Sequence, residues 1–190
     1  ASSSEIIARA QSLMDSAIDK YTKGDIQGEY NDVSQSVDLY PTPVSHFMKA
    51  GIATYYIHDV DTAIESLVYC INNNHRLKEC YYMISNCYYN KDNWDKTVFY
   101  ANKFLDLERN SKDAMYVYEL RGMSKSLMGQ PNEAIADYLQ AIKYDGVVDY
   151  NFFNIYNNLA YEYMKKGELN KAKNYMDKSF KYSHTDGNAW

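Results

Sequence analysis

Bulky apolar residues and small residues recur together at helical spacing in five places along the chain. The small positions are 34 to 38 residues apart: Ala17, Gly51, Ser85, Gly122 and Ala160. Four residues before each stands a bulky apolar or aromatic residue: Leu13, Phe47, Tyr81, Tyr118 and Tyr156. Because four residues make about one turn of an α-helix, the two members of each pair share a helix face. The pattern predicts five similar amphipathic helices.

A turn and a second helix are expected to follow each of these helices. Seven residues after each small position comes a turn residue: Gly24, His58, Asp92, Gly129 or Gly167. Glycine suits a helix end because it reaches the left-handed conformation without a Cβ clash. Twelve residues after each small position stand Glu29, Ala63, Thr97, Ala134 and Ala172, of which all but Glu29 are small. Small residues on facing helices let the backbones approach, which predicts antiparallel hairpins.

Helix-start signals give approximate bounds for ten helices. Ser2 to Glu5 and Thr62 to Glu65 have the spacing of a capping box, and Pro131 suits a first helical turn. First helices are expected near 3–22, 44–57, 77–90, 112–128 and 150–166. Their partners are expected near 26–39, 61–72, 93–107, 131–144 and 168–182. The longer repeat intervals place their extra residues between hairpins, where loops absorb length at little cost.

Composition supports one helical domain. The 190 residues include only 8 Gly and 3 Pro, too few for a turn-rich sandwich or barrel. We expect a single repeat domain over 1–190, with units at about 10–43, 44–77, 78–111, 115–148 and 153–186. No apolar run approaches the roughly 18 residues of a spanning helix, so membrane insertion is not expected. A net charge of -5 and a pI of about 5.4 argue against a nucleic-acid partner.

Cysteine and histidine positions predict no metal site and no cofactor. Cys80 and Cys87 lie seven apart on one expected helix, about 10 Å along its axis and beyond disulfide reach. We interpret the three cysteines as small buried hydrophobic residues, although a bridge between Cys70 and Cys80 is geometrically conceivable. The histidines His46, His58, His75 and His184 are scattered rather than clustered at ligand spacing. The sequence also contains no G-x-S-x-G, Gly-rich phosphate loop or H-E-x-x-H, so we do not expect an enzyme.

The repeated large, small, turn and small positions resemble the tetratricopeptide repeat family over roughly residues 10 to 186. The fourth unit resembles it most, through Tyr118, Gly122, Gly129, Ala134, Tyr138 and Ala141. The resemblance implies an all-α fold: a right-handed superhelical array of about five antiparallel helix hairpins, or α-solenoid. First helices would line its concave face. Pentatricopeptide repeats, which read RNA, fit the acidic balance poorly, and Sel1-like repeats carry more Gly and Ala.

The inner face implied by this resemblance is rich in Tyr, Met and Asn. Its expected peptide-binding residues are Met48, Ile52, Tyr55, Tyr82, Met83, Asn86, Tyr89, Tyr116, Met123, Asn157, Asn158 and Tyr161. Tyrosine supplies contact area, methionine adapts its shape, and asparagine can pair with a peptide backbone. The alternative is that these tyrosines only pack between hairpins. The cationic clamp of the family's chaperone-binding members is absent from this stripe.

The predicted function is a non-enzymatic scaffold or adaptor that binds a peptide segment or partner protein in its groove. Two alternatives stay open. One is an accessory factor in the assembly of a bacterial envelope complex. The other is a structural module that self-associates, for example as a homodimer, through apolar residues of the last helix: Tyr175, Met176, Phe180 and Tyr182. Both the cytoplasm and the bacterial periplasm are compatible with the sequence.

Overall fold

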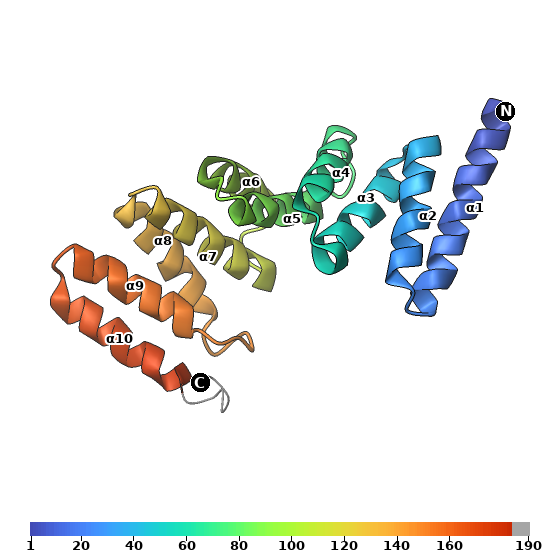
Figure 1. Cartoon of the computed structure of the whole chain (residues 1–190). Helices are drawn as coiled ribbons and strands as arrows, with labels where there is room; N and C mark the ends of the chain where they lie inside the picture. Colours follow the sequence, from blue (N-terminus) through green and yellow to red (C-terminus); the bar gives the residue numbers. More distant parts are fainter. Residues whose placement is uncertain (184–190) are drawn as a thin grey trace. The chain divides into compact units, whose positions relative to one another are not determined.

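The computed structural model describes residues 1–183, which hold ten α-helices and no strand (Figure 1). The chain divides into two compact units, Ala1–Lys91 and Asp92–Trp190. His184 and the ends of the predicted last repeat and of the predicted domain lie outside the described residues. The prediction of an all-α fold is therefore confirmed, while the extent of a single domain over 1–190 stays a prediction.

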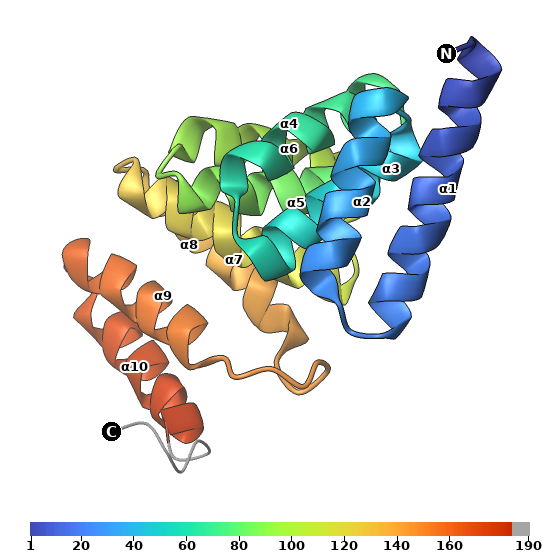
Figure 2. The same ribbon diagram turned by 45° about the vertical axis from the view of Figure 1, so that its right-hand side comes forward.

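Unit 1 contains two helix hairpins and a fifth helix. The first hairpin pairs α1 (Ser3–Thr22) with α2 (Ile26–Leu39), as Figures 1 and 2 show. The second pairs α3 (Pro43–Ile52) with α4 (Val60–Asn72). A π-helical turn, η1 (Ala53–Ile57), extends α3 to the predicted end of that helix. The unit closes with α5 (Leu77–Asn90), whose bounds are those predicted.

Unit 2 contains one helix at its start, which corresponds to the predicted partner helix at 93–107, and two hairpins. It opens with α6 (Trp94–Leu107). The next hairpin pairs α7 (Lys112–Leu127) with α8 (Pro131–Ala141), which ends in a short 3-10 helix, η2 (Ile142–Tyr144). The last pairs α9 (Phe153–Lys165) with α10 (Leu169–Ser183). All five predicted first helices and all five predicted second helices are thus present within a few residues of their expected bounds.

Side-chain caps start most of these helices. Ser2 forms the predicted capping box with Glu5, since its Oγ accepts from the Glu5 amide at 3.3 Å and Glu5 accepts from the Ser2 amide at 3.2 Å. Pro131 lies in the first turn of α8, as expected. The capping box predicted at Thr62 is wrong. Asp59 caps α4 instead, because its carboxylate accepts from the Thr62 amide at 3.1 Å one turn earlier.

The five predicted turn residues all adopt the left-handed conformation. Their φ angles are 74° at Gly24, 60° at His58, 56° at Asp92, 73° at Gly129 and 76° at Gly167. A left-handed residue after the last helical turn lets the chain reverse. Where histidine or aspartate replaces glycine, the same φ carries the Cβ strain that glycine avoids.

Paired helices approach closely at one of the two glycine small positions and not at the other. A Cβ built on Gly122 would lie 2.8 Å from Cε1 of Tyr138, so α7 and α8 meet at this point. A Cβ on Gly51 would meet nothing within 4 Å, which contradicts the expectation of a close crossing there. Glu29, the exception in the pattern, is buried on α2 and its Oε2 has no hydrogen-bond partner among the described residues. Burial raises the pKa of that carboxyl.

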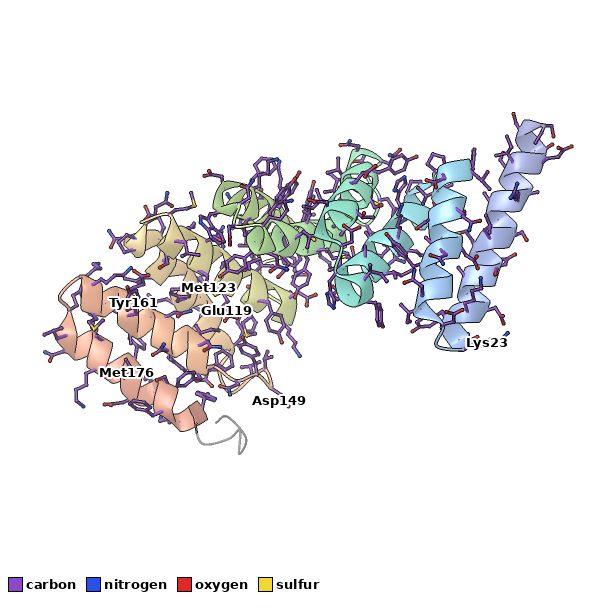
Figure 3. The ribbon with its side chains drawn as sticks, in the orientation of Figure 1. Lys23, Glu119, Met123, Asp149, Tyr161 and Met176 are labelled. Carbon is purple, nitrogen blue, oxygen red and sulfur yellow. The ribbon has the colours of Figure 1, made fainter. Side chains whose placement is uncertain are left out.

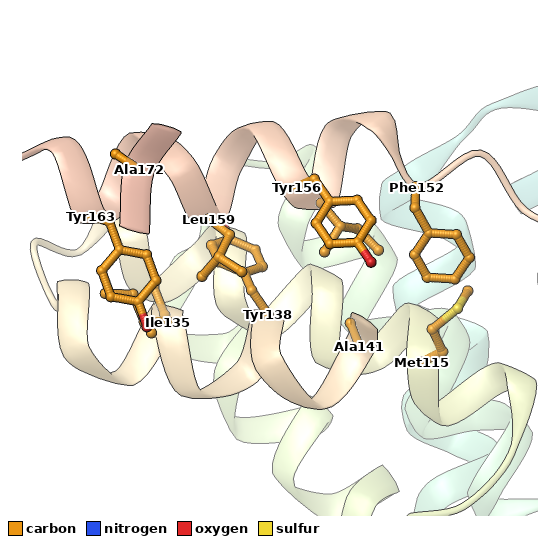
Figure 4. Packing of buried hydrophobic residues seen from close by; sticks show 11 residues of the cluster. Met115, Ile135, Tyr138, Ala141, Phe152, Tyr156, Leu159, Tyr163 and Ala172 are labelled. Carbon is orange, nitrogen blue, oxygen red and sulfur yellow. The ribbon is translucent and has the colours of Figure 1, made fainter. Parts of the chain in front are cut away.

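The core of unit 2 is formed by α7, α8, α9 and α10 (Figure 4). Tyr138 and Ala141 of α8 face Leu159 and Tyr156 of α9, with Phe152 beside them. These large apolar side chains are almost completely buried, which is the main favourable contribution to folding of such a unit.

A buried ion-pair network joins α7 to α8 beside this core. Asp137 accepts two hydrogen bonds from Arg121, at 2.9 and 2.6 Å, and lies 3.1 Å from the ammonium of Lys125. The Asp137 side chain is 4% exposed, and those of the two cations less than a fifth. Because the carboxylate is paired twice, its burial is compensated.

The aromatic residues of α10 mostly cover its own hairpin. Tyr175 stacks on Tyr163 with ring centroids 5.6 Å apart, and Tyr182 stacks on Tyr156 at 6.1 Å. The hydroxyls of Tyr156 and Tyr182 both donate to Asp145. Burial raises the pKa of both, that of Tyr182 to about 12. These contacts hold the segment after η2 against α9 and α10, and they leave less apolar surface on α10 than its sequence suggests.

Candidate functional site

In unit 1, part of the predicted binding stripe is used for packing. Ile52 is buried with Ala17 and Val33, and Met48 packs against that cluster. Met83 on α5 is also buried. Ile52 and Met83 are therefore mostly covered by the fold, Met48 is half-buried, and contact of these three residues with a ligand stays a prediction. The apolar residues indicate one face of each helix, but they do not indicate whether other helices cover that face.

The other predicted residues of unit 1 are more accessible. Tyr55 is 57% exposed at the π-helical turn, while Tyr82, Asn86 and Tyr89 are half-buried on α5. The side-chain amide of Asn86 donates to the Tyr82 carbonyl at 2.8 Å, so one of its two N–H groups is already used. Tyr56, next to Tyr55, is exposed to the same degree.

In unit 2, the predicted residues lie on α7 and α9. Tyr116 and Met123 are half-buried on α7, and Asn157 and Asn158 are half-buried on α9. Tyr161, one turn further along α9, is 50% exposed. Figure 3 labels Met123 on α7 and Tyr161 on α9. Tyr116 and Met123 pack against the core cluster of unit 2, and both stay partly accessible.

Three asparagines form an amide ladder on α9, which we define as Asn154, Asn157 and Asn158. Asn157 and Asn158 follow Asn154 by three and four residues, so both lie one helical turn from it on the same side of the helix. In the described part of the chain, none of the three side-chain amides makes a hydrogen bond. Each amide carries two donors and one acceptor. The ladder therefore presents unused hydrogen-bonding groups in a row, beside the exposed ring of Tyr161.

On the α7 side of the same region, two aromatic rings and one carboxyl group lie in contact with one another. The hydroxyl of Tyr150, from the segment between α8 and α9, donates to Glu119 Oε2 at 2.9 Å. The Tyr150 ring meets that of Tyr116 edge-on, with centroids 5.2 Å apart. Burial raises the pKa of Glu119. Periodicity could not have found Tyr150, because the residue lies outside any helix and reaches α7 through the tertiary fold.

Polar contacts hold α7 and α9 together at the other end of the ladder. Ser126 at the end of α7 donates to Glu162 of α9, and Lys165 lies 3.0 Å from the same carboxylate. The Lys165 ammonium also lies 4.6 Å from the centroid of the Tyr161 ring. Because Glu162 is buried and paired, it fixes α9 against α7. Tyr161 is thereby presented on a supported helix face.

Metal-ion sites and membrane-spanning helices are both absent from residues 1–183. No three histidine, cysteine, aspartate or glutamate side chains there are grouped so that they could hold a metal ion. Within the same residues, no helix is both long enough and apolar enough to cross a membrane.

Solved structures with the same fold cover nearly the whole chain. A MamA protein shares 20% identity over 96% of this chain and 97% of its own, with a TM-score of 0.77. MamA 41-end from Desulfovibrio magneticus RS-1 shares 9% identity over 95% and 98% of the two chains, with a TM-score of 0.78. YrrB shares 12% identity over 92% and 86%, with a TM-score of 0.76. No curated protein sequence matches the chain.

A family comparison agrees with the repeat pattern. Residues 116–147 and 153–184 each match the family model described as the tetratricopeptide repeat. These two segments correspond to the α7–α8 and α9–α10 hairpins, the units in which the sequence pattern is clearest. Within these two segments, the chain carries tetratricopeptide repeats.

Proposed function

We propose that the chain is a non-enzymatic interaction scaffold that binds an extended peptide segment of a partner protein along the α7 and α9 face of unit 2. The amide ladder of α9 is the observation that carries this proposal. Three half-buried or exposed amides without an internal partner are costly to leave unused once a ligand covers them. A peptide backbone offers a donor and an acceptor at every residue.

The spacing of the ladder suits an extended chain. Asn154 and Asn158 are four residues apart, which corresponds to about 6 Å along a helix axis. Two residues of an extended peptide advance by about 6.6 Å. Alternate peptide groups of an extended ligand can therefore reach successive amides. Asn157 lies between them, offset around the helix, and can contact the peptide groups in between.

Apolar contact would come from Tyr116, Met123 and Tyr161. Tyrosine loses little side-chain entropy on binding and methionine adapts to irregular shapes, so these residues favour a ligand with apolar side chains beside its bonded backbone. The remaining predicted residues of unit 1, Tyr55 foremost among them, would form a further contact surface. YrrB, one of the proteins with this fold, is described as a TPR protein with an unusual peptide-binding site.

The proposal is tested with the Asn157→Ala/Asn158→Ala double variant. The probe is a library of amide-capped random peptides, selected on the wild-type chain and then measured individually by fluorescence anisotropy. Losing two hydrogen bonds worth about 1 kcal/mol each weakens binding about 30-fold. Asn174→Ala removes an exposed amide from α10 and serves as the matched control, with unchanged affinity expected.

Two results would contradict the proposal. One is equal affinity of the selected peptides for the wild-type chain and the double variant. The other is a loss of affinity of similar size in the Asn174→Ala control, which would place the binding surface elsewhere.

A further inference from the structure

A hollow of about 420 Å³ lies between α6 and α7 of unit 2, two helices that pack against each other and are labelled in Figure 1. We call it the α6–α7 hollow. Two guanidinium groups and one carboxylate are among the six side chains that line it: Asn102, Leu105, Asp106, Arg109, Tyr118 and Arg121. None of the six belongs to the amide ladder or to the apolar residues beside it. The α6–α7 hollow is therefore a separate surface of the unit.

Internal bonds fix Arg121 in the lining of the hollow. Its Nε and Nη2 donate to Asp137 at 2.9 and 2.6 Å, and its Nη1 donates to Asn102 Oδ1 at 2.8 Å. A guanidinium carries five N–H groups, so these three bonds leave two unused. The Asn102 amide nitrogen donates to nothing in the described part of the chain. Arg121 and Asn102 thus hold unused donors at fixed positions.

The last turn of α6 orients Arg109. Its Nε donates to the Leu105 carbonyl at 3.0 Å, and its own carbonyl accepts from the Tyr144 hydroxyl at 3.4 Å. Its Nη2 lies 3.7 Å from Asp106 Oδ1, which is too far for a hydrogen bond, and the two side chains are 67% and 68% exposed. An ion pair that is so exposed contributes little to stability. The terminal N–H groups of Arg109 are therefore accessible to a ligand.

The charges around the hollow leave one positive charge in excess. Arg109 and Arg121 line it together with one carboxylate, that of Asp106. Asp137 pairs with Arg121 and also lies 3.1 Å from the ammonium of Lys125. This group of side chains therefore contains three cations and two carboxylates. One further carboxylate would balance the charges, whereas a phosphorylated side chain, with a charge of about −2, would exceed the balance.

We propose that the α6–α7 hollow binds one carboxylate group of a peptide partner through Arg109 and through the unused N–H groups of Arg121 and Asn102. A planar guanidinium presents two parallel N–H groups that match the two oxygens of a carboxylate. Because internal bonds already order these donors, little side-chain entropy is lost on binding. Arg109 exchanges a distant contact with Asp106 for a direct one. This inference does not rest on peptide binding at the amide ladder.

The experiment titrates the nitrogen-15-labelled full chain with short peptides and follows the side-chain N–H signals of Asn102, Arg109 and Arg121 by NMR. Three probes are capped Gly-Ala-Xaa-Ala-Gly peptides in which the central residue is glutamate, glutamine or phosphoserine. We expect saturable shifts with the glutamate peptide, at a Kd on the order of 1 mM, and binding at least about tenfold weaker with the capped glutamine peptide.

A fourth probe distinguishes the two sources of a carboxylate. It is the glutamine peptide with a free C-terminus, whose only carboxylate belongs to the main chain. Binding of the capped glutamate peptide assigns the hollow to acidic side chains, and binding of the fourth peptide alone assigns it to a chain end. Either result supports the proposal, and binding of neither peptide overturns it.

Two variants test the named donors. Arg109→Gln removes an exposed guanidinium and should weaken binding of the glutamate peptide at least about tenfold. Asn102→Asp keeps the oxygen that accepts from Arg121 but replaces the amide donor with a negative charge, so binding should be lost. Arg9→Gln changes an exposed arginine of α1 in unit 1 and is the matched control, with unchanged affinity expected. Backbone amide spectra show whether each variant is folded.

Several results would overturn the proposal. They are equal affinity for the capped glutamate and glutamine peptides, unchanged affinity of Arg109→Gln, an equal loss in Arg9→Gln, and a phosphoserine peptide that binds more than about tenfold tighter than the glutamate peptide. The Asn157→Ala/Asn158→Ala variant should bind the glutamate peptide as the wild-type chain does. A loss of binding in that variant would place the carboxylate at the amide ladder instead of the α6–α7 hollow.

Discussion

Gly122→Ala tests whether helix crossing in unit 2 depends on the absence of a side chain. The new Cβ would lie 2.8 Å and 3.0 Å from Cε1 and Cδ1 of Tyr138, and 3.3 Å from Cβ of Asp137. Tyr138 is 1% exposed, so its ring lies against other side chains of the core. Overpacking of this kind costs about 1–3 kcal/mol. Alanine recovers about 0.5–1 kcal/mol of helix stability, so the net expected loss is about 0.5–2 kcal/mol.

The matched control is Gly51→Ala at the equivalent repeat position. A Cβ there meets nothing within 4 Å, so only the helix-propensity gain of about 0.5–1 kcal/mol remains. The two substitutions should therefore shift stability in opposite directions. Urea unfolding followed by circular dichroism gives the free energy of unfolding. Hydrogen exchange on peptides from α3 and α7 assigns each change to its unit.

The reasoning is refuted if Gly122→Ala stabilises α7 as much as Gly51→Ala stabilises α3. That result would mean that α7 and α8 separate freely and that the small residue is not required for their approach. A similar loss of stability in both variants would also contradict this explanation, because nothing in the structure obstructs a side chain at position 51.

Three further variants address buried titratable groups. Glu29→Gln should stabilise the chain by a margin that grows as pH rises above 4.5. Burial raises the pKa of Glu29 in the folded wild-type chain, so this carboxyl loses its proton at lower pH in the unfolded chain than in the folded one. Urea midpoints from pH 4 to 8 measure the margin. Burial lowers the pKa of His46, so stability should fall as pH drops from 6.5 through that lowered value, and a His46→Phe/Ser66→Ala variant should lack this slope in the same titration. Asp137→Asn leaves Arg121 and Lys125 without their carboxylate, and it should lower the free energy of unfolding in urea by about 3–5 kcal/mol.

Much of the fold follows from local sequence signals. The helices at 26–39 and 77–90 have the bounds that the repeat pattern predicts. Turn residues and helix starts could be predicted because they depend on residues that are close together in the sequence. The start of α9 at Phe153 rather than 150 depends on tertiary contact. Tyr150 is held outside the helix by its bond to Glu119 on α7. The π-helical turn at 53–57 has no signal that periodicity could detect.

The site was predictable only as a helix face. Ile52 and Asn86 each stand one residue after the small position of their repeats, yet Ile52 is buried and Asn86 is half-buried. The difference arises because an apolar side chain is drawn into any available core, whereas an amide gains nothing there without a hydrogen-bond partner. Residue type, and not helical spacing alone, therefore indicates which positions of a helix face are buried. In this chain Tyr55 and Asn158 of the predicted stripe stay accessible, whereas Ile52 and Met83 are buried.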